Sequence, residues 1–111
     1  MTSDAQTALA AALDRMWVEY LPKTRERVAI LETAAADFAA NHLSIEQHAA
    51  ASSAAHKLAG VLGTFGLTRG TVLARELEIM YSPQNGPDPA LAERLSSTAA
   101  ELRAVVEARS G

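Results

Sequence analysis

Three histidines occur in the chain, and the surroundings of one of them, His56, suit phosphoryl chemistry. A histidine imidazole changes charge near neutral pH, so a large part of it is the neutral nucleophile in the cytoplasm. One of its nitrogens can attack an electrophilic phosphorus atom and later leave again, and histidine is among the side chains that form covalent intermediates. The residues around His56 therefore decide whether it can do such chemistry.

Small residues surround His56 on the helix that the sequence predicts around it. At about 100° per residue, the core face of this helix carries Leu58, Val61, Leu62 and Phe65 with Ala51 and Ala54. The opposite arc of about 120° holds His56 with small neighbours only: Ala49, Ser52, Ser53, Ala59, Gly60 and Gly63. Exposed helix faces usually carry long polar side chains, and an interior glycine costs about 1 kcal/mol relative to alanine. We interpret the small residues as a means of access to His56, because they let another protein approach its imidazole closely.

Two simpler interpretations of His56 stay open from the residues alone. A lone histidine on a helix is usually an exposed residue without a role. Small residues on a helix face can also mark close helix–helix packing, which would bury His56 as a hydrogen-bonded core residue. That packing would leave the more hydrophobic face exposed, which disfavours it.

A metal site at His56 is disfavoured. His48 and His56 are eight residues apart and lack the i, i+4 spacing that places two imidazoles on one metal, and His42 does not complete a site with them. The chain has no cysteine, which excludes a thiolate metal site and a disulfide framework. We also expect no carboxylate beside His56 to act as its partner or general base.

Turn signals divide the sequence into about five helical segments, and nothing resembles an alternating strand. We expect helices over about residues 4–20, 22–41, 45 to 64 or 65, 68–80, and from Asp88-Pro89 onward. Pro22 fits the first turn of the second segment. Ser44 and Gln47 can form a capping box at the third, Gly66 can end it, and Thr68 can cap the fourth. Residues 82–87 are the clearest loop, and residues 109–111 are expected to fray.

These segments predict an all-α fold, an antiparallel four-helix bundle with an additional N-terminal helix. A length of 111 residues leaves room for one domain, residues 1–111, with one core. Met16, Trp17 and Tyr20 are expected in that core, and Arg69 and Arg75 in solvent. The net charge is −3 without a basic run, which gives little support to nucleic-acid or membrane-surface binding. No apolar stretch approaches the roughly 20 residues of a membrane span, so a cytoplasmic protein is expected.

The run His56-Lys57-Leu58-Ala59-Gly60, continued by Gly63, Gly66-Leu67, Leu73 and Leu77-Glu78, resembles the histidine-containing phosphotransfer (HPt) domain. The signature of that family is a histidine, an apolar residue two positions later and glycines four and ten positions later, followed by a leucine-containing helix. The resemblance implies a four-helix bundle with His56 exposed midway along one helix. It also implies phosphoryl exchange between His56 and the aspartate of response-regulator receiver domains, with Gly60 leaving space for the phosphoryl group.

The chain departs from the family at one position. The lysine that is common three residues after the histidine, and is thought to steady the phosphate, is Ala59 here. Lys57 lies about 100° around the helix from His56, so it could reach the phosphate only at the edge of its range; a solvated flank is its simpler role. Ser53 could donate a hydrogen bond to a phosphoryl oxygen or be an inert small residue.

The sequence thus predicts a histidine phosphocarrier of a two-component phosphorelay, without ATP-dependent kinase activity of its own. Its partners would be receiver domains and a hybrid histidine kinase. The domain would need no cofactor, since the resemblance places Mg²⁺ on the receiver, and it is expected to be a monomer. The alternative hypothesis is a helical module that binds a receiver or kinase through the same face without taking the phosphoryl group.

Overall fold

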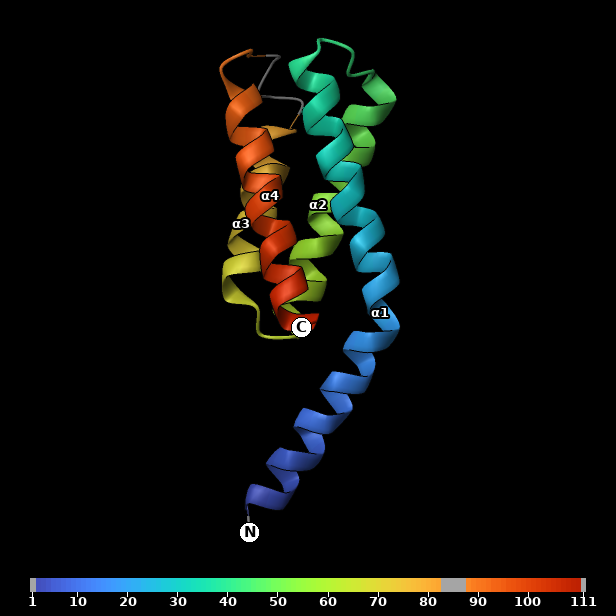
Figure 1. Ribbon diagram of the computed structural model, residues 1–111, viewed down its shortest axis with the longest axis vertical. Helices are drawn as coiled ribbons and strands as arrows, with labels where there is room; N and C mark the ends of the chain where they lie inside the picture. The colour runs from blue at the N-terminus through green and yellow to red at the C-terminus, as the bar shows by residue number, and fades with distance from the viewer. Residues whose placement is uncertain (1, 83–87, 111) are drawn as a thin grey trace.

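The computed structural model describes residues 2–82 and 88–110, which form four α-helices (Figure 1). They are α1 (Thr2–Ala39), α2 (Ile45–Thr64), α3 (Thr68–Met80) and α4 (Leu91–Ser110). Contacts join α1 to α2, α2 to α3, α3 to α4 and α4 to α1, so each helix packs against two others. The predicted all-α four-helix bundle is confirmed. No helix in the described part of the chain is both long and apolar enough to cross a membrane.

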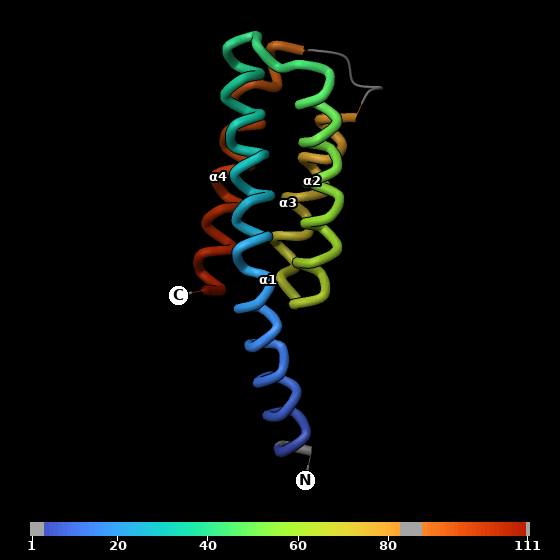
Figure 2. The backbone as a smooth tube through the Cα atoms, turned by 90° about the vertical axis from the view of Figure 1, so that its right-hand side faces the viewer, coloured from blue at the N-terminus to red at the C-terminus, as the bar shows by residue number. Residues whose placement is uncertain are grey.

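Helix α1 differs from the prediction at Pro22. We expected one helix to end near Tyr20 and another to begin at Pro22, but α1 is continuous, with Pro22 inside it. A proline removes one helical hydrogen bond and can kink a helix instead of ending it. Trp17 before it and Val28 after it are both buried, so core packing continues across the proline. The additional N-terminal helix is therefore the first part of α1, which projects past the other helices (Figures 1 and 2).

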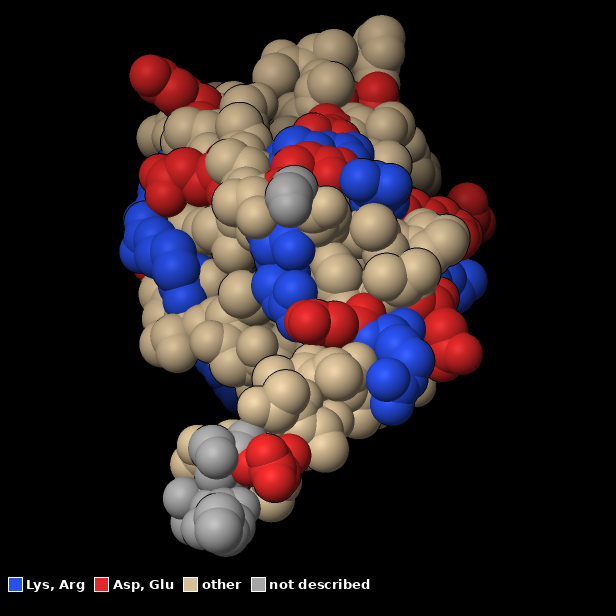
Figure 3. All heavy atoms as spheres, turned by 60° about the horizontal axis from the view of Figure 1, so that its bottom comes forward, with Lys and Arg blue, Asp and Glu red and all other residues tan. Residues whose placement is uncertain are grey.

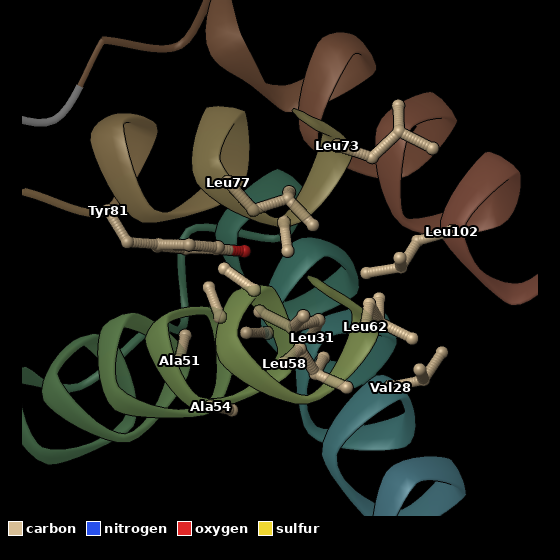
Figure 4. Close-up of a cluster of buried hydrophobic side chains, with 14 of the residues drawn as sticks. Val28, Leu31, Ala51, Ala54, Leu58, Leu62, Leu73, Leu77, Tyr81 and Leu102 are labelled. Atoms are coloured by element: carbon tan, nitrogen blue, oxygen red, sulfur yellow. The ribbon is translucent and has the colours of Figure 1, made fainter. Parts of the chain in front are cut away.

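All four helices contribute large side chains to one core (Figure 4). The largest buried aliphatic residues are Val28, Leu31, Leu58, Leu62, Leu73, Leu77, Leu95, Leu102 and Val106. Their recurrence at three- and four-residue intervals is what makes each helix amphipathic. Of the three residues expected in the core near the N-terminus, Trp17 is buried, whereas Met16 and Tyr20 are exposed. Both residues precede Pro22 in α1, close to the part of this helix that projects past the other helices (Figure 1).

The ends of α2 follow the predicted signals. The Ser44 side chain accepts a hydrogen bond from the Gln47 backbone N–H at 3.0 Å, and the Ser44 backbone N–H donates to Oε1 of Gln47 at 2.9 Å. Gly66 takes a positive φ of 71°, which a residue without Cβ adopts most easily. Its backbone N–H donates to the carbonyl of Gly63, and that of Leu67 to the carbonyl of Leu62. This capped turn reverses the chain and lays α3 antiparallel to α2.

The start of α3 differs from the prediction, and α4 begins at Leu91, shortly after the predicted start at Asp88-Pro89. Thr68 does not cap α3: it is the first helical residue, and the N-cap is Leu67, which makes no side-chain cap hydrogen bond. Asp88 accepts a hydrogen bond from the backbone N–H of Ala90 through Oδ1, just before α4 begins at Leu91. Of the predicted loop at residues 82–87, positions 83–87 lie outside the described residues.

The C-terminal end of α4 is held by α1. We expected residues 109–111 to fray, but Arg109 and Ser110 are helical; Gly111 lies outside the described residues. The Trp17 indole N–H donates to Oγ of Ser110 at 3.0 Å, and Arg109 lies over the Trp17 ring and pairs with Asp14 at 2.7 Å. Contacts made across 93 positions of sequence therefore fix an end that local sequence signals leave free.

Further ion pairs join α1 and α4 along the surface. Arg25 pairs with Glu107 at 2.8 Å, and Arg103 with Glu32 at 2.6 Å. The hydrogen bonds from Arg25 lower the pKa of Glu107. Figure 3 shows basic and acidic side chains interspersed on the face seen from the end where α1 projects. Exposed pairs of this kind contribute little individually, so the apolar core is the main stabilising element.

Tyr81 generates a prediction about stability. Its ring is buried, and among the described residues its hydroxyl finds no hydrogen-bond partner. A buried hydroxyl without a partner is destabilising. We expect Tyr81→Phe to raise the free energy of unfolding by about 1 kcal/mol, measured by urea denaturation at pH 7. A fall of more than about 1 kcal/mol would show that the hydroxyl is stabilising after all.

The same residue predicts a dependence on alkaline pH. Burial raises the pKa of Tyr81 from 10.0 to about 12. Between these values the tyrosine ionises in the unfolded chain but stays protonated in the folded one, so the free energy of unfolding falls as the pH rises from 10 to 12. Other groups titrate in this range, so the measurement is the difference between the two proteins. The wild type should lose more stability than Tyr81→Phe over this interval; parallel curves would contradict the assignment.

Candidate functional site

His56 lies midway along α2 with its side chain in solvent. The side chain is 73% exposed, whereas its neighbours Ala55 and Leu58 are buried in the core. Because these neighbours fix the rotation of α2, the imidazole is presented from a rigid helix and not from a loop. The structure therefore contradicts the interpretation of His56 as a buried core histidine.

A carboxylate contacts His56, contrary to the expectation from the sequence. Nδ1 of His56 lies 2.8 Å from Oε2 of Glu78, which belongs to α3. The prediction was wrong because it considered neighbours on one helix only, and Glu78 is 22 residues away along the chain. The antiparallel packing of α3 on α2 brings the two together. The sequence did offer one indication of this contact, because Glu78 belongs to the run of residues that resembles the family.

This contact assigns the protons of the neutral imidazole. An ionised carboxylate only accepts hydrogen bonds, so Nδ1 carries the hydrogen and donates it to Glu78. The other nitrogen, Nε2, then holds the free lone pair. In the neutral ring the nucleophilic atom is therefore Nε2, on the side of the imidazole away from Glu78. The hydrogen bond also orients the ring, as a partner carboxylate does for a catalytic histidine.

The surroundings of His56 are open at most of the predicted positions. Ser53, Gly60 and Gly63 are exposed, and a Cβ added to Gly60 would meet no atom within 4 Å. Lys57 is exposed as well. No side chain of the described residues thus fills the space next to the imidazole at Gly60. A contribution of Ser53 or Lys57 to phosphate binding stays a prediction.

Ala59 is the exception to the predicted exposed stripe. Its exposed fraction is only 3%, although the helix wheel placed it beside His56 in the solvent-facing arc. Helix α3 covers this edge of α2: the Thr71 hydroxyl donates to the carbonyl of Ala59 at 3.5 Å. The stripe is therefore narrower than predicted, and its α3 side is a packing contact.

A hollow of about 1060 Å³ lies beside His56, between the N-terminal half of α2 and the ends of the neighbouring helices. Phe38, Leu43, Ile45, Met80 and Tyr81 supply its apolar lining, and Ser52, Ser53, His48, His56 and Glu78 supply polar groups. Ile45 is 90% exposed, and His48 packs edge-on against Tyr81 with ring centroids 5.7 Å apart. His42 is exposed and does not line the hollow. Sequence reasoning missed this feature because its walls come from several separate segments.

Comparison with known proteins points to one family. A family model described as the Hpt domain matches residues 15–109. Over 76 residues, 68% of this chain, the sequence is 40% identical to Protein RcaC of Microchaete diplosiphon. The chain corresponds to about 12% of the length of that relative. No solved structure gave a significant match.

The chain belongs to the histidine-containing phosphotransfer (Hpt) family. Its members are helical phosphocarriers that work with receiver and kinase domains in two-component phosphorelays. The predicted family and function class are therefore confirmed. The family match begins at residue 15, so most of the projecting part of α1 lies before it.

The contact between Glu78 and His56 predicts a role in setting the tautomer. We expect Glu78→Ala to slow phosphoryl transfer on the order of ten- to a hundred-fold, by analogy with the loss of a hydrogen-bond partner that orients a metal-binding histidine. Transfer rates with a labelled receiver domain measure this, and ¹⁵N spectra of the imidazole at a pH where it is neutral report the tautomer. Wild type should show a lone pair at Nε2, and the variant a mixture. Glu76→Ala, on another face of α3, is the matched control; equal rates for all three proteins would exclude the role.

The open space at Gly60 predicts that a short side chain there raises the stability of the domain and that a long one slows phosphoryl transfer. Gly60→Ala should raise the free energy of unfolding by about 1 kcal/mol, because alanine favours helix and the added Cβ meets no atom. Gly60→Gln should fold as well as the wild type but exchange phosphate more slowly, since its side chain extends over the approach to His56. Ala100→Gln, at an exposed position of α4, controls for adding a glutamine. If Gly60→Gln transfers at the wild-type rate, the small residues do not serve access.

Proposed function

We propose that His56 is the phosphoacceptor of this Hpt domain and that it exchanges a phosphoryl group with the aspartate of a receiver domain. The observation that carries the proposal is the geometry of the imidazole. Its Nδ1 lies 2.8 Å from a carboxylate oxygen of Glu78, and its Nε2 has no hydrogen-bond partner among the described residues. The Cβ position of Gly60, one turn along the helix, has no atom within 4 Å. A nucleophile is thus oriented and accessible to a second protein.

The transfer step can be written on these atoms. The Nε2 lone pair attacks the phosphorus of the aspartyl phosphate; the N–P bond forms as the bond from phosphorus to the carboxylate oxygen breaks, and the aspartate leaves as a carboxylate. The hydrogen on Nδ1 stays in place, and its hydrogen bond to Glu78 stabilises the positive charge that develops on the ring. In the reverse direction the imidazole leaves and the aspartate is phosphorylated.

The division of labour follows from phosphoryl-transfer chemistry. Such transfer depends mainly on positioning and on stabilising charge on the phosphoryl oxygens. This chain would supply the positioned imidazole and a docking surface, while the receiver would supply the aspartate and Mg²⁺. We propose that the domain requires no cofactor of its own and carries phosphate without taking it from ATP. A monomeric state and a cytoplasmic location stay predictions of the same proposal.

The docking surface would include the hollow beside His56. It combines exposed apolar side chains such as Ile45 with polar groups next to the imidazole. Protein–protein interfaces commonly combine an apolar centre with a polar rim, and this surface contains both kinds of group. The alternative function, binding without transfer, would use the same surface, so the labelling experiment must decide between them.

The test is incubation with a receiver domain that carries radiolabelled phosphate on its aspartate. We expect acid-labile label on the wild type and none on His56→Gln. His42→Gln is the control, because His42 is exposed and does not line the hollow, and it should be labelled like the wild type. Label on His56→Gln equal to the wild type would reject His56 as the acceptor. Receiver binding without label on the wild type would select the binding module, and ATP-dependent labelling of the isolated domain would reject the carrier assignment.

A further inference from the structure

A phosphoryl group on His56 would raise an electrostatic problem at this site. A phosphoryl group carries about 1.5 to 2 negative charges, and the Glu78 carboxylate lies 2.8 Å from Nδ1 of the same imidazole. A phosphoryl group on Nε2 and this carboxylate would lie on opposite sides of one ring, where like charges repel each other. A cation near Nε2 would offset the repulsion, and Ala59 supplies none. The helices that build the site, α2 and α3, contain three basic residues: Lys57, Arg69 and Arg75.

The packing of α3 on α2 fixes where these three lie. His56 contacts Glu78 at one level, and a turn or two farther along, Thr71 bonds the Ala59 carbonyl and lies 3.6 Å from the Cβ position of Gly63. Because the helices are antiparallel, one turn forward from His56 and one turn back from Glu78 lead to the same level. That step reaches Ala59 and Gly60 on α2 and Arg75 on α3. Along the helix axis, Arg75 is therefore displaced from the His56–Glu78 contact by one helical pitch, about 5.4 Å. An arginine side chain can span this displacement.

The face of α3 distinguishes Arg75 from Arg69. Thr71, Arg75 and Glu78 recur at i, i+4 and i+7, so they share one stripe of the helix, and the first and last of them contact α2. Arg69 lies on the other edge of α3, where it pairs with Glu101 of α4 at 2.8 Å. Lys57 lies on α2 about 100° around from His56. Arg75 is thus the basic residue of these helices on the stripe that carries Glu78.

Arg75 is also available. Its side chain is exposed, and within the described residues it takes part in no hydrogen bond or ion pair. Four other arginines are each bound to a carboxylate: Arg25, Arg69, Arg103 and Arg109. At the same level as Arg75, the Cβ position of Gly60 has no atom within 4 Å, so no side chain of the described residues occupies that part of the surface near the imidazole.

We propose that Arg75 binds the phosphoryl group of phosphorylated His56 and offsets its repulsion by Glu78. A guanidinium presents paired N–H donors that match two phosphate oxygens, which makes it well suited to this contact. Arg75 is then a positioning and charge-balancing residue, while Glu78 holds Nδ1. The role rests on the proposed function, because it requires the phosphoryl group to be on His56.

The test measures the phosphorylated domain separately from its partner. The domain is labelled by a phosphorylated receiver and purified from it, and the rate of loss of phosphohistidine and the ³¹P chemical shift are then recorded. Arg75→Ala should lose phosphate roughly ten-fold faster than the wild type, as expected for loss of a charge-assisted hydrogen bond at a partly exposed site, and its ³¹P signal should shift. Arg75→Lys should recover part of the effect. Arg69→Ala, on the same helix but facing α4, should behave like the wild type.

The outcomes separate this proposal from the one on which it rests. If wild type, Arg75→Ala and Arg69→Ala are all labelled and lose phosphate at the same rate, Arg75 does not bind the phosphoryl group, while His56 remains the acceptor. If Arg75→Ala changes only the rate of exchange with the receiver, Arg75 serves docking and the proposal is rejected. If the wild type takes no label at His56, the proposed function fails and the role of Arg75 fails with it.

Discussion

The antiparallel packing of α2 against α3 is the constraint on which the site depends. It sets Glu78 at 2.8 Å from Nδ1 of His56, and it covers Ala59 with the next helix. The core residues Leu58, Leu62, Leu73 and Leu77 maintain this packing, and Gly66 provides the turn that makes it possible. The chemistry of an exposed histidine thus depends on buried leucines that it does not touch. Helices α1 and α4 complete the core and supply no group that contacts the imidazole among the described residues.

The site combines an open side and a closed side around one imidazole. On the closed side, the Glu78 carboxylate orients the ring and places the hydrogen on Nδ1. On the open side, the Cβ position of Gly60, one turn along the helix from His56, has no atom within 4 Å. A reactive group shared between two proteins needs both properties, because the nucleophile must be oriented before the partner arrives and accessible when it does. The two requirements are met by residues on different helices, so a change to one need not disturb the other.

Sequence reasoning found the elements that local patterns specify. The capping box at Ser44 and Gln47, the stop at Gly66 and the exposure of His56 all follow from spacing within one helix, where geometry is known in advance. The failures were non-local. Glu78 as a partner and the burial of Ala59 depend on the neighbouring helix, and the ordered end at Ser110 depends on Trp17, 93 positions away. Pro22 was misjudged because apolar residues on both sides of it bury the same face, and tertiary packing outweighed a local helix-breaking preference.

Sequence separation gives the helical hairpin formed by α2 and α3 a further property, which concerns the order of assembly. The contact between His56 and Glu78 closes 22 positions of chain, whereas the one between Trp17 and Ser110 closes 93. Loop-closure entropy makes the longer closure less favourable by about 1.3 kcal/mol, and local contacts of this kind form quickly. His56 and Glu78 thus belong to two helices that are neighbours in the sequence, unlike α1 and α4. In kinetic terms, the site belongs to the part of the bundle that can form before α1 and α4 pack together.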